Sequence, residues 1–436
     1  MFATAFVGNM ILARCLGASG MGIWSIMVTF LSMILLVCGP GIASANVYYV
    51  AQGKHTAGES WAVTLLLGTG FGIVGVCTGK VLLWLRFKSI AGIEDQRLIL
   101  LLLLSLPLLY ITDWGYKIIL GMDRIGLMNL LGLISNIFHL GLIILFVEIM
   151  KIGLWGVVTA YLGMYLSSTL MLIVTFLILM RPKEFRLRWK TIQLDVVYGV
   201  KIYFGKLSEW TNNRIDLLIA PLFLDSKQIG LYAVVVAVTE KLWLIPSAIS
   251  QAVFPKISAD IKGRPELVGR ACRTSIIIML PIMLLLIAGG WWVIPALFGS
   301  EFQGSYLPML AILPGIFMLG ISQILSASLA ATNHPATISA VVTVASVINV
   351  ILNFLLIPRM GITGCSLAST GSYTFQAVAL LWYYCQYTGV RPVSLIRVQF
   401  SDLLILLKQS RQIIANGSYE RQESLRFKLF NKICSR

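Results

Sequence analysis

The sequence predicts an all-α polytopic membrane protein with twelve membrane-spanning helices in two tandem halves. Composition is the first reason: 58% of the residues are hydrophobic and 12% are charged, whereas soluble domains carry about 25% charged residues. The second reason is that apolar runs of about 20 residues recur along nearly the whole chain, each long enough to cross the hydrocarbon core as a helix. The third is a repeat of landmark residues at a spacing of 208 positions.

The apolar runs define the expected helices in chain order. They are too long for membrane strands and do not alternate apolar with polar residues, so strands are not expected. The expected spans are residues 1–14, 21–50, 61–85, 98–120, 126–147, 153–180, 195–224, 229–254, 271–298, 305–330, 336–357 and 362–385. An even number of spans places both termini on the same side of the membrane.

The formal net charge is +16, and the distribution of the basic residues indicates how the chain is oriented in the membrane. Twenty-one Lys and Arg residues fall in the loops and tail on the side of the two termini, against seven on the opposite side. Cytoplasmic loops are the ones enriched in Lys and Arg, so both termini are expected in the cytoplasm. The basic surplus then faces anionic lipid head groups, and nucleic acid is not expected as a partner.

The repeat divides the chain into an N-lobe (1–185), a C-lobe (186–385) and a basic tail (386–436). Gly22-Ile23-Trp24 falls on Gly230-Leu231-Tyr232, and Gly153 and Gly156 fall on Gly361 and Gly364. Six spans per lobe make the repeat parallel, about an axis along the membrane normal. The first span is short beside its counterpart, which predicts either that about ten residues of the first helix are missing or that this helix is genuinely short. The tail is expected to hold a cytoplasmic amphipathic helix on the inner leaflet.

The seventh span has an unusual polar face. At 100° per residue, Lys206, Glu209, Asn213 and Asp216 fall within an arc of about 80°. That arc is flanked on one side by Tyr203, Trp210 and Arg214. Cationic groups can hold phosphate oxygens and aromatic rings can stack on sugars, so this face is typical of a path for a phosphorylated, sugar-bearing head group. The alternative is a buried structural network in which Lys206 pairs with Glu209.

Two further charged pairs lie inside expected spans, where isolated charges are costly. Glu240 is as far below the outer end of its span as Arg214 is in the preceding one, so we expect these two side chains to lie close together. Asp113 and Lys117 share one face of the fourth span. They either line a cavity opposite the seventh span or only neutralise each other. Pro107 and Pro314 lie mid-span in equivalent helices, where proline permits bending.

No sequence pattern indicates an enzyme, a metal site or a cofactor. The seven cysteines are scattered, without metal-ligand spacing, and a phosphate-binding loop for ATP is not found. A membrane-embedded polysaccharide polymerase would need a sizeable loop for its catalytic groups. The expected loops are too short to provide one.

Several motifs, taken in order, resemble one family. Residues 11–17 (ILARCLG) followed by Gly22-Ile23-Trp24 are similar to the opening of the oligosaccharide and polysaccharide flippases, with the Wzx-type O-antigen transporters nearest in kind. These belong to the multidrug/oligosaccharidyl-lipid/polysaccharide (MOP, MATE-like) exporter superfamily. Residues 213–258, 297–302 and 356–364 also resemble family patterns.

The resemblance implies two six-helix lobes around a central cavity in the bacterial inner membrane. It implies translocation of an undecaprenyl-diphosphate-linked oligosaccharide by alternating access, for O-antigen, capsule or exopolysaccharide synthesis. Arg14, Lys206 and Arg214 would then meet the diphosphate or acidic sugars, and Asp216, Glu209 or Glu240 would couple transport to an ion gradient. The polymerase and chain-length machinery are possible partners. A cation-coupled multidrug antiporter and a lipid II or teichuronic-acid exporter remain as alternatives.

Overall fold

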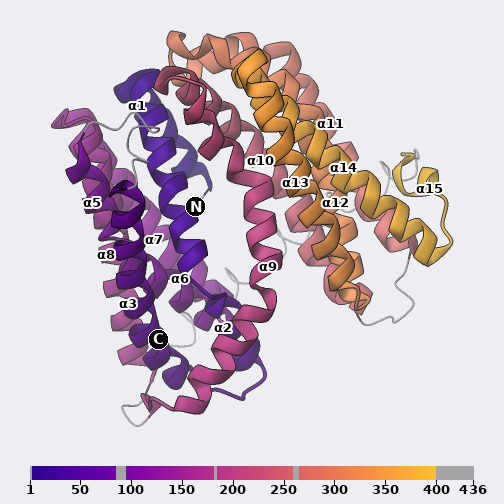
Figure 1. The fold of residues 1–436 in the computed structure, drawn as a ribbon. Helices are drawn as coiled ribbons and strands as arrows, with labels where there is room; N and C mark the ends of the chain where they lie inside the picture. Colours follow the sequence, from indigo (N-terminus) through magenta and orange to yellow (C-terminus); the bar gives the residue numbers. More distant parts are fainter. Residues whose placement is uncertain (1, 85–94, 181–183, 259–264, 399–436) are drawn as a thin grey trace, which may run out of the picture. The chain divides into compact units, whose positions relative to one another are not determined.

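The computed structural model describes residues 2–84, 95–180, 184–258 and 265–398, and all regular structure in them is helical (Figure 1). The first group of helices is α1 (Phe2–Cys38), α2 (Ile42–Ala51), α3 (Ala57–Leu82), α5 (Gln96–Leu103), α6 (Leu106–Gly121), α7 (Ile125–Ile143), α8 (Leu154–Leu179) and α9 (Trp189–Ile219). The second is α10 (Ser226–Ser258), α11 (Pro265–Phe298), α12 (Tyr306–Ala331), α13 (Pro335–Met360), α14 (Ile362–Thr388) and α15 (Pro392–Ile396). A π-helix, η2 (Ile144–Ile149), continues α7, and 3₁₀-helices follow α9 and α11, namely η4 (Ala220–Leu222) and η5 (Ser300–Ser305).

The predicted class, an all-helical membrane protein, is confirmed. Nine helical segments of the described chain are long and apolar enough to cross a membrane. The count of twelve is not confirmed by length and apolarity alone, because α9 and α14 are not among these nine segments. The first of the nine also holds two helices, which join at Gly17 with non-helical backbone angles.

Two expected spans are interrupted, and both interruptions have a local cause. The span expected over 21–50 breaks at residues 39–41 (Gly-Pro-Gly), and α2 begins after Gly41, which has a φ of 68°. The span expected over 98–120 breaks at residues 104–105, and α6 then begins with Pro107 in its first turn, a position that needs no amide donor. Pro314, in contrast, lies inside the unbroken α12.

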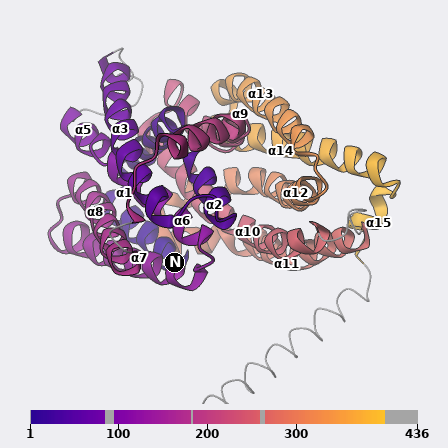
Figure 2. The same ribbon diagram turned by 90° about the horizontal axis from the view of Figure 1, so that it is seen from below.

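The described helices form two compact units. The first comprises Met1–Lys241, Leu286–Ile316 and Ala336–Gln376. In it α3 packs on α6, α7 packs on α8, and α2 contacts both α6 and α9 (Figures 1 and 2). Its core includes Trp61 stacked on Phe176 with 4.3 Å between ring centroids. These contacts fix α2 and α6, two of the helices that carry polar groups of the candidate site.

The second unit comprises Leu242–Leu285, Phe317–Pro335 and Ala377–Arg436. Within it Arg273 donates to the Ser394 carbonyl at 2.7 Å, which ties α15 to α11. His334 packs on Tyr387 with 4.4 Å between ring centroids. The lobe boundary expected at residues 185 and 186 stays a prediction. The tail helix expected beyond residue 398 lies outside the described residues.

Candidate functional site

Helix α9 carries most of the predicted site and is held closely against the α1–α2 segment. A Cβ atom built on Gly199 would lie 1.8 Å from the Pro40 carbonyl oxygen, so only glycine allows this approach. Further along α9, Lys206 Nζ donates to Ser44 Oγ at 2.6 Å, and Tyr203 donates to the Val37 carbonyl at 3.3 Å. The polar face of α9 therefore faces α1 and α2.

Helix α6 brings Asp113 and Lys117 to the same region. Asp113 is exposed although its neighbours Thr112 and Trp114 are 4% and 3% exposed. Its carboxylate is within electrostatic range of Lys117 and Lys206. Lys206 lies on α9 and Lys117 on the same helix as Asp113, so the carboxylate has basic groups on two helices around it. Whether Asp113 and Lys117 line a cavity opposite α9 or only neutralise each other stays a prediction.

Glu209 and Trp210 complete this part of α9. Glu209 is exposed and interacts electrostatically with Lys206. Trp210 Nε1 donates to Ser32 Oγ of α1 at 3.3 Å. Asn213, one turn further along, is half-buried. Cationic, anionic and aromatic groups thus line one stretch of helix, as the sequence predicts, and their role in transport stays a prediction.

Arg214 and Glu240 form an ion pair between α9 and α10. The shortest nitrogen-to-oxygen distance is 2.8 Å, and the side chains are 36% and 28% exposed. They line a cavity of about 190 Å³ together with Asn9, Trp24 and Ser25 of α1. This distance confirms the prediction that the two side chains lie close together. The pair borders open space and is not sealed in a core.

Asp216 differs from Glu209, the acidic residue two turns before it on α9, because it is 4% exposed. Its carboxylate accepts hydrogen bonds from the Tyr232 hydroxyl and, at 2.8 Å, from the Leu217 amide. Ser369 of α14 lies 3.5 Å from the same carboxylate. A carboxylate with several donors is well satisfied in a structural position. Its candidacy for ion coupling, and that of Glu240, stays a prediction.

A buried amide network beside Asp216 was missed by the sequence reasoning. Asn212 donates to Gln376 Oε1 at 2.9 Å and accepts from Ser372 at 2.6 Å, while Asn349 donates to the Asn212 carbonyl at 3.1 Å. Asn353, one turn after Asn349, is also fully buried. The available signal was the spacing of Asn349 and Asn353, which puts two amides on one face of an apolar helix.

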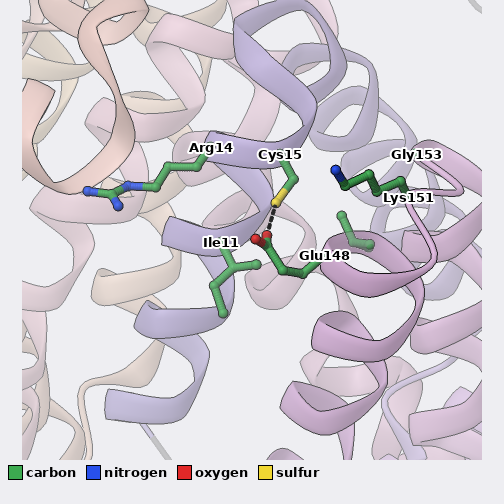
Figure 3. A pocket seen from close by; sticks show the side chains of 7 residues that line it. Ile11, Arg14, Cys15, Glu148, Lys151 and Gly153 are labelled. Atoms are coloured by element: carbon green, nitrogen blue, oxygen red, sulfur yellow. Dashed lines mark hydrogen bonds between the residues drawn. The ribbon is translucent and has the colours of Figure 1, made fainter.

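Arg14 lies on α1 and makes its hydrogen bonds at the end of α11, to the carbonyl oxygens of Ala296 and Leu297. It borders a cavity of about 540 Å³ that is also lined by Cys15, Glu148 and Lys151. Figure 3 shows the Cys15 sulfur pointing at the Glu148 carboxylate, to which it donates at 2.7 Å, while the Arg14 side chain extends in another direction. The hydrogen bonds of Arg14 thus go to the end of α11, and its predicted contact with a diphosphate stays a prediction.

His55 and Asp195 form a second buried pair that the sequence reasoning did not single out. They are 5% and 0% exposed, and His55 Nδ1 lies 3.5 Å from Asp195 Oδ1. None of their ring nitrogens or carboxylate oxygens has a hydrogen-bond partner among the described residues. Among all residues that the structure describes, no three His, Cys, Asp or Glu side chains come close enough together to hold a metal ion.

Comparison with known families adds to this geometry. A sequence profile described as "Polysaccharide biosynthesis protein" matches residues 11–307. The chain belongs to this family. With several helices long and apolar enough to cross a membrane in its described part, this family member is a multi-pass membrane protein.

Two curated relatives of this polysaccharide biosynthesis protein match most of its length. The "Probable low-salt glycan biosynthesis flippase Agl15" of Haloferax volcanii is 24% identical over 401 residues, which cover 88% of this chain and 81% of the relative. The "Putative O-antigen transporter" of Shigella flexneri is 21% identical over 395 residues, which cover 87% of this chain and 93% of the relative.

Solved structures agree on the fold of the family member. A lipid II flippase, MurJ, in an inward closed conformation matches with a TM-score of 0.74 and 17% identity, over 93% of this chain and 89% of that one. An inward-facing multidrug resistance MATE family transporter of the MOP superfamily matches with a TM-score of 0.73 and 15% identity, over 89% and 95%. The predicted MATE-like fold is therefore confirmed.

Proposed function

We propose that the protein translocates a lipid-linked oligosaccharide, carried on undecaprenyl diphosphate, across the bacterial cytoplasmic membrane. The observation that carries the proposal is the meeting of Lys206 on α9 with Asp113 and Lys117 on α6, where the Asp113 side chain is exposed. The hydrogen bond to Ser44 uses one of three donors of the Lys206 ammonium group, so the others remain for phosphate oxygens.

The flippase and O-antigen transporter names of the two curated relatives support this substrate class. In the proposed cycle the charged head group passes along the polar face of α9 while the lipid tail stays in the bilayer. Trp210 and Tyr203 offer aromatic rings to the sugars. Both termini lie in the cytoplasm, as the distribution of Lys and Arg indicates.

Coupling to a proton or sodium gradient is assigned to Asp216 and Glu240. Both are carboxylates inside membrane helices, and each has a partner whose contact depends on its charge, namely Tyr232 for Asp216 and Arg214 for Glu240. Taking up a cation would change these contacts. A polymerase and the chain-length machinery would receive the product on the outer face.

The experiment compares two lysines of one helix. Lys206→Gln should lower translocation of an undecaprenyl-diphosphate-linked oligosaccharide into proteoliposomes about tenfold, the effect of losing one charged hydrogen bond in a site of low dielectric. Lys201→Gln is the control, because Lys201 is exposed near the end expected at the cytoplasm. A strain lacking the protein should accumulate lipid-linked units on the inner leaflet. Normal surface glycan in that strain would overturn the proposal.

The multidrug antiporter is the competing function, and the same vesicles separate the two. An antiporter would move organic cations and would be helped, not harmed, by loss of the Lys206 charge. Cation transport by the parent protein that increases with Lys206→Gln would favour the antiporter.

A further inference from the structure

The end of α11 receives a cationic cap from a distant part of the chain. Helix α11 ends at Phe298, and the last carbonyls of a helix have no partners within it. Arg14 Nε donates to the Leu297 carbonyl at 2.9 Å, and a second nitrogen of the same guanidinium donates to the Ala296 carbonyl. A cation is also favoured at the negative end of the helix dipole. Arg14 therefore joins α1 to α11.

The segment after α11 supplies a carboxylate that caps a helical segment of α1. Gly17 has a φ of 66°, so a new helical segment of α1 begins at Ala18. The Ala18 amide donates to Glu301 Oε2 at 3.1 Å, which places a carboxylate at the positive end of that segment. A Cβ atom on Gly17 would lie 3.1 Å from the same oxygen. The two caps run in opposite directions between the same two regions.

Just beyond these caps, α1 and α10 cross in backbone contact. A Cβ atom built on Gly22 would lie 1.8 Å from the Ser226 carbonyl oxygen, and one built on Gly230 would lie 1.8 Å from the Ala18 carbonyl oxygen. No side chain fits between the two helices there. Three residues further along α1, Ser25 lines the cavity of the Arg214–Glu240 pair. Along α1 the caps and the crossing therefore lie between Asn9 and Ser25, two of the residues that line this cavity.

We propose that Arg14 and Glu301 form a latch that closes the non-cytoplasmic end of the translocation path. The inference rests on the proposed function and assigns Arg14 to closure. The latch connects two segments from different halves of the repeat, which alternating access must separate and rejoin. Arg14 and Glu301 are both exposed. Exposed hydrogen bonds of this kind are individually weak, so the latch can open and close in every cycle.

The test measures access to Ser25 from outside the cell. In a chain whose native cysteines are replaced, Ser25→Cys is labelled with a membrane-impermeant maleimide in intact cells. Arg14→Ala and Glu301→Ala should each raise the labelling rate about tenfold, because each removes contacts that favour the closed state. Arg14→Lys keeps the charge and should give an intermediate rate. Arg359→Ala, which removes an exposed arginine expected on the same side, should leave the rate unchanged.

Labelling does not require the substrate, so it separates the latch from the proposed function. Equal rates in the parent, Arg14→Ala and Glu301→Ala proteins, at equal amounts of protein in the membrane, would overturn the latch and leave the flippase proposal standing. A second outcome is that the two variants are labelled faster while the parent protein does not move the lipid-linked oligosaccharide. That result would support the latch and overturn the proposed function. Protein amount on immunoblots guards against variants that do not fold.

Discussion

The Arg214 guanidinium and the Glu240 carboxylate lie 2.8 Å apart, on two helices that meet beside an open cavity. The pair joins α9 to α10 at a depth where an unpaired charge is costly. Each side chain therefore depends on the other, and both can also be reached by a ligand in the cavity.

Exchanging the two charges tests this dependence. Arg214→Glu and Glu240→Arg should each abolish most translocation, because each places two like charges at contact distance. The double variant restores opposite charges and should recover at least part of the activity, measured as oligosaccharide moved in proteoliposomes. Losses that simply add in the double variant would show that the pair is not the functional unit.

Acidification should destabilise the protein through His55. Burial lowers the pKa of His55 below its ordinary value, Glu59 opposes this shift, and Lys54 adds to it. The unfolded chain binds the proton near pH 6.5 and the folded chain only at lower pH. The neutral ring therefore contributes stability above the unfolded pKa, and this contribution is lost as the pH falls through the folded pKa.

The measurement is the thermal unfolding midpoint in detergent at pH 7.5 and pH 5. The parent protein should lose a few degrees more than His55→Gln, at about 2–4 °C for each kcal/mol. Equal losses in both proteins would mean that another group carries the acid sensitivity. Asp195→Asn, measured in parallel, removes the neighbouring carboxylate and shows how much of the loss depends on the pair.

Two adjacent asparagines should behave differently when replaced by leucine. Asn212→Leu removes the side-chain hydrogen bonds that Asn212 makes with the buried Gln376 and Ser372 and should lower the free energy of unfolding by about 2–4 kcal/mol. Asn213→Leu changes the predicted path and should lower transport with little effect on stability. The unfolding midpoint and the transport rate of each variant decide the matter. A lower unfolding midpoint for Asn213→Leu, with normal stability for Asn212→Leu, would show that Asn213 and not Asn212 has the structural role.

Alanine should not be tolerated where α1 and α10 cross. Gly22→Ala and Gly230→Ala force the two backbones apart and should each destabilise the protein by about 1–3 kcal/mol, as overpacking does. Gly141→Ala in α7 is the matched control, since nothing lies within 4 Å of a Cβ atom there. It should be neutral or slightly stabilising, because alanine is the better helix former. Similar unfolding midpoints for the three variants would contradict the observed crossing.

Sequence patterns predicted those parts of the site that depend on one helix at a time. The 100° rule placed Lys206 and Glu209 on one face of α9, and matching depth put Arg214 beside Glu240. Both predictions depend on regular helix geometry, and the residues between the paired positions are compatible with an uninterrupted helix. The break at residues 104–105 lies beside Pro107, where bending was expected. The break at residues 39–41 was not predicted, because the apolar run continues through it and only packing decides where a glycine or proline ends a helix.

Contacts to the backbone were beyond sequence reasoning. Arg14 was predicted to meet a diphosphate, yet its partners here are the carbonyls of Ala296 and Leu297. Every residue carries a carbonyl, so no residue type marks such a partner. Asn212 and Asn213 likewise differ only in which side of α9 they occupy, and the neighbours of that side come from α13 and α14, far along the chain.

The spacing of 208 positions made Gly22 and Gly230 equivalent, and the structure sets them against each other. Equivalent residues that meet across a pseudo-twofold axis make the kind of contact found in isologous dimers, where one surface serves both partners. Each glycine makes room for a main-chain carbonyl of the opposite helix. A carbonyl group of the main chain is present whatever the residue type. A side chain introduced at either glycine therefore cannot be accommodated by a second substitution in the opposite helix.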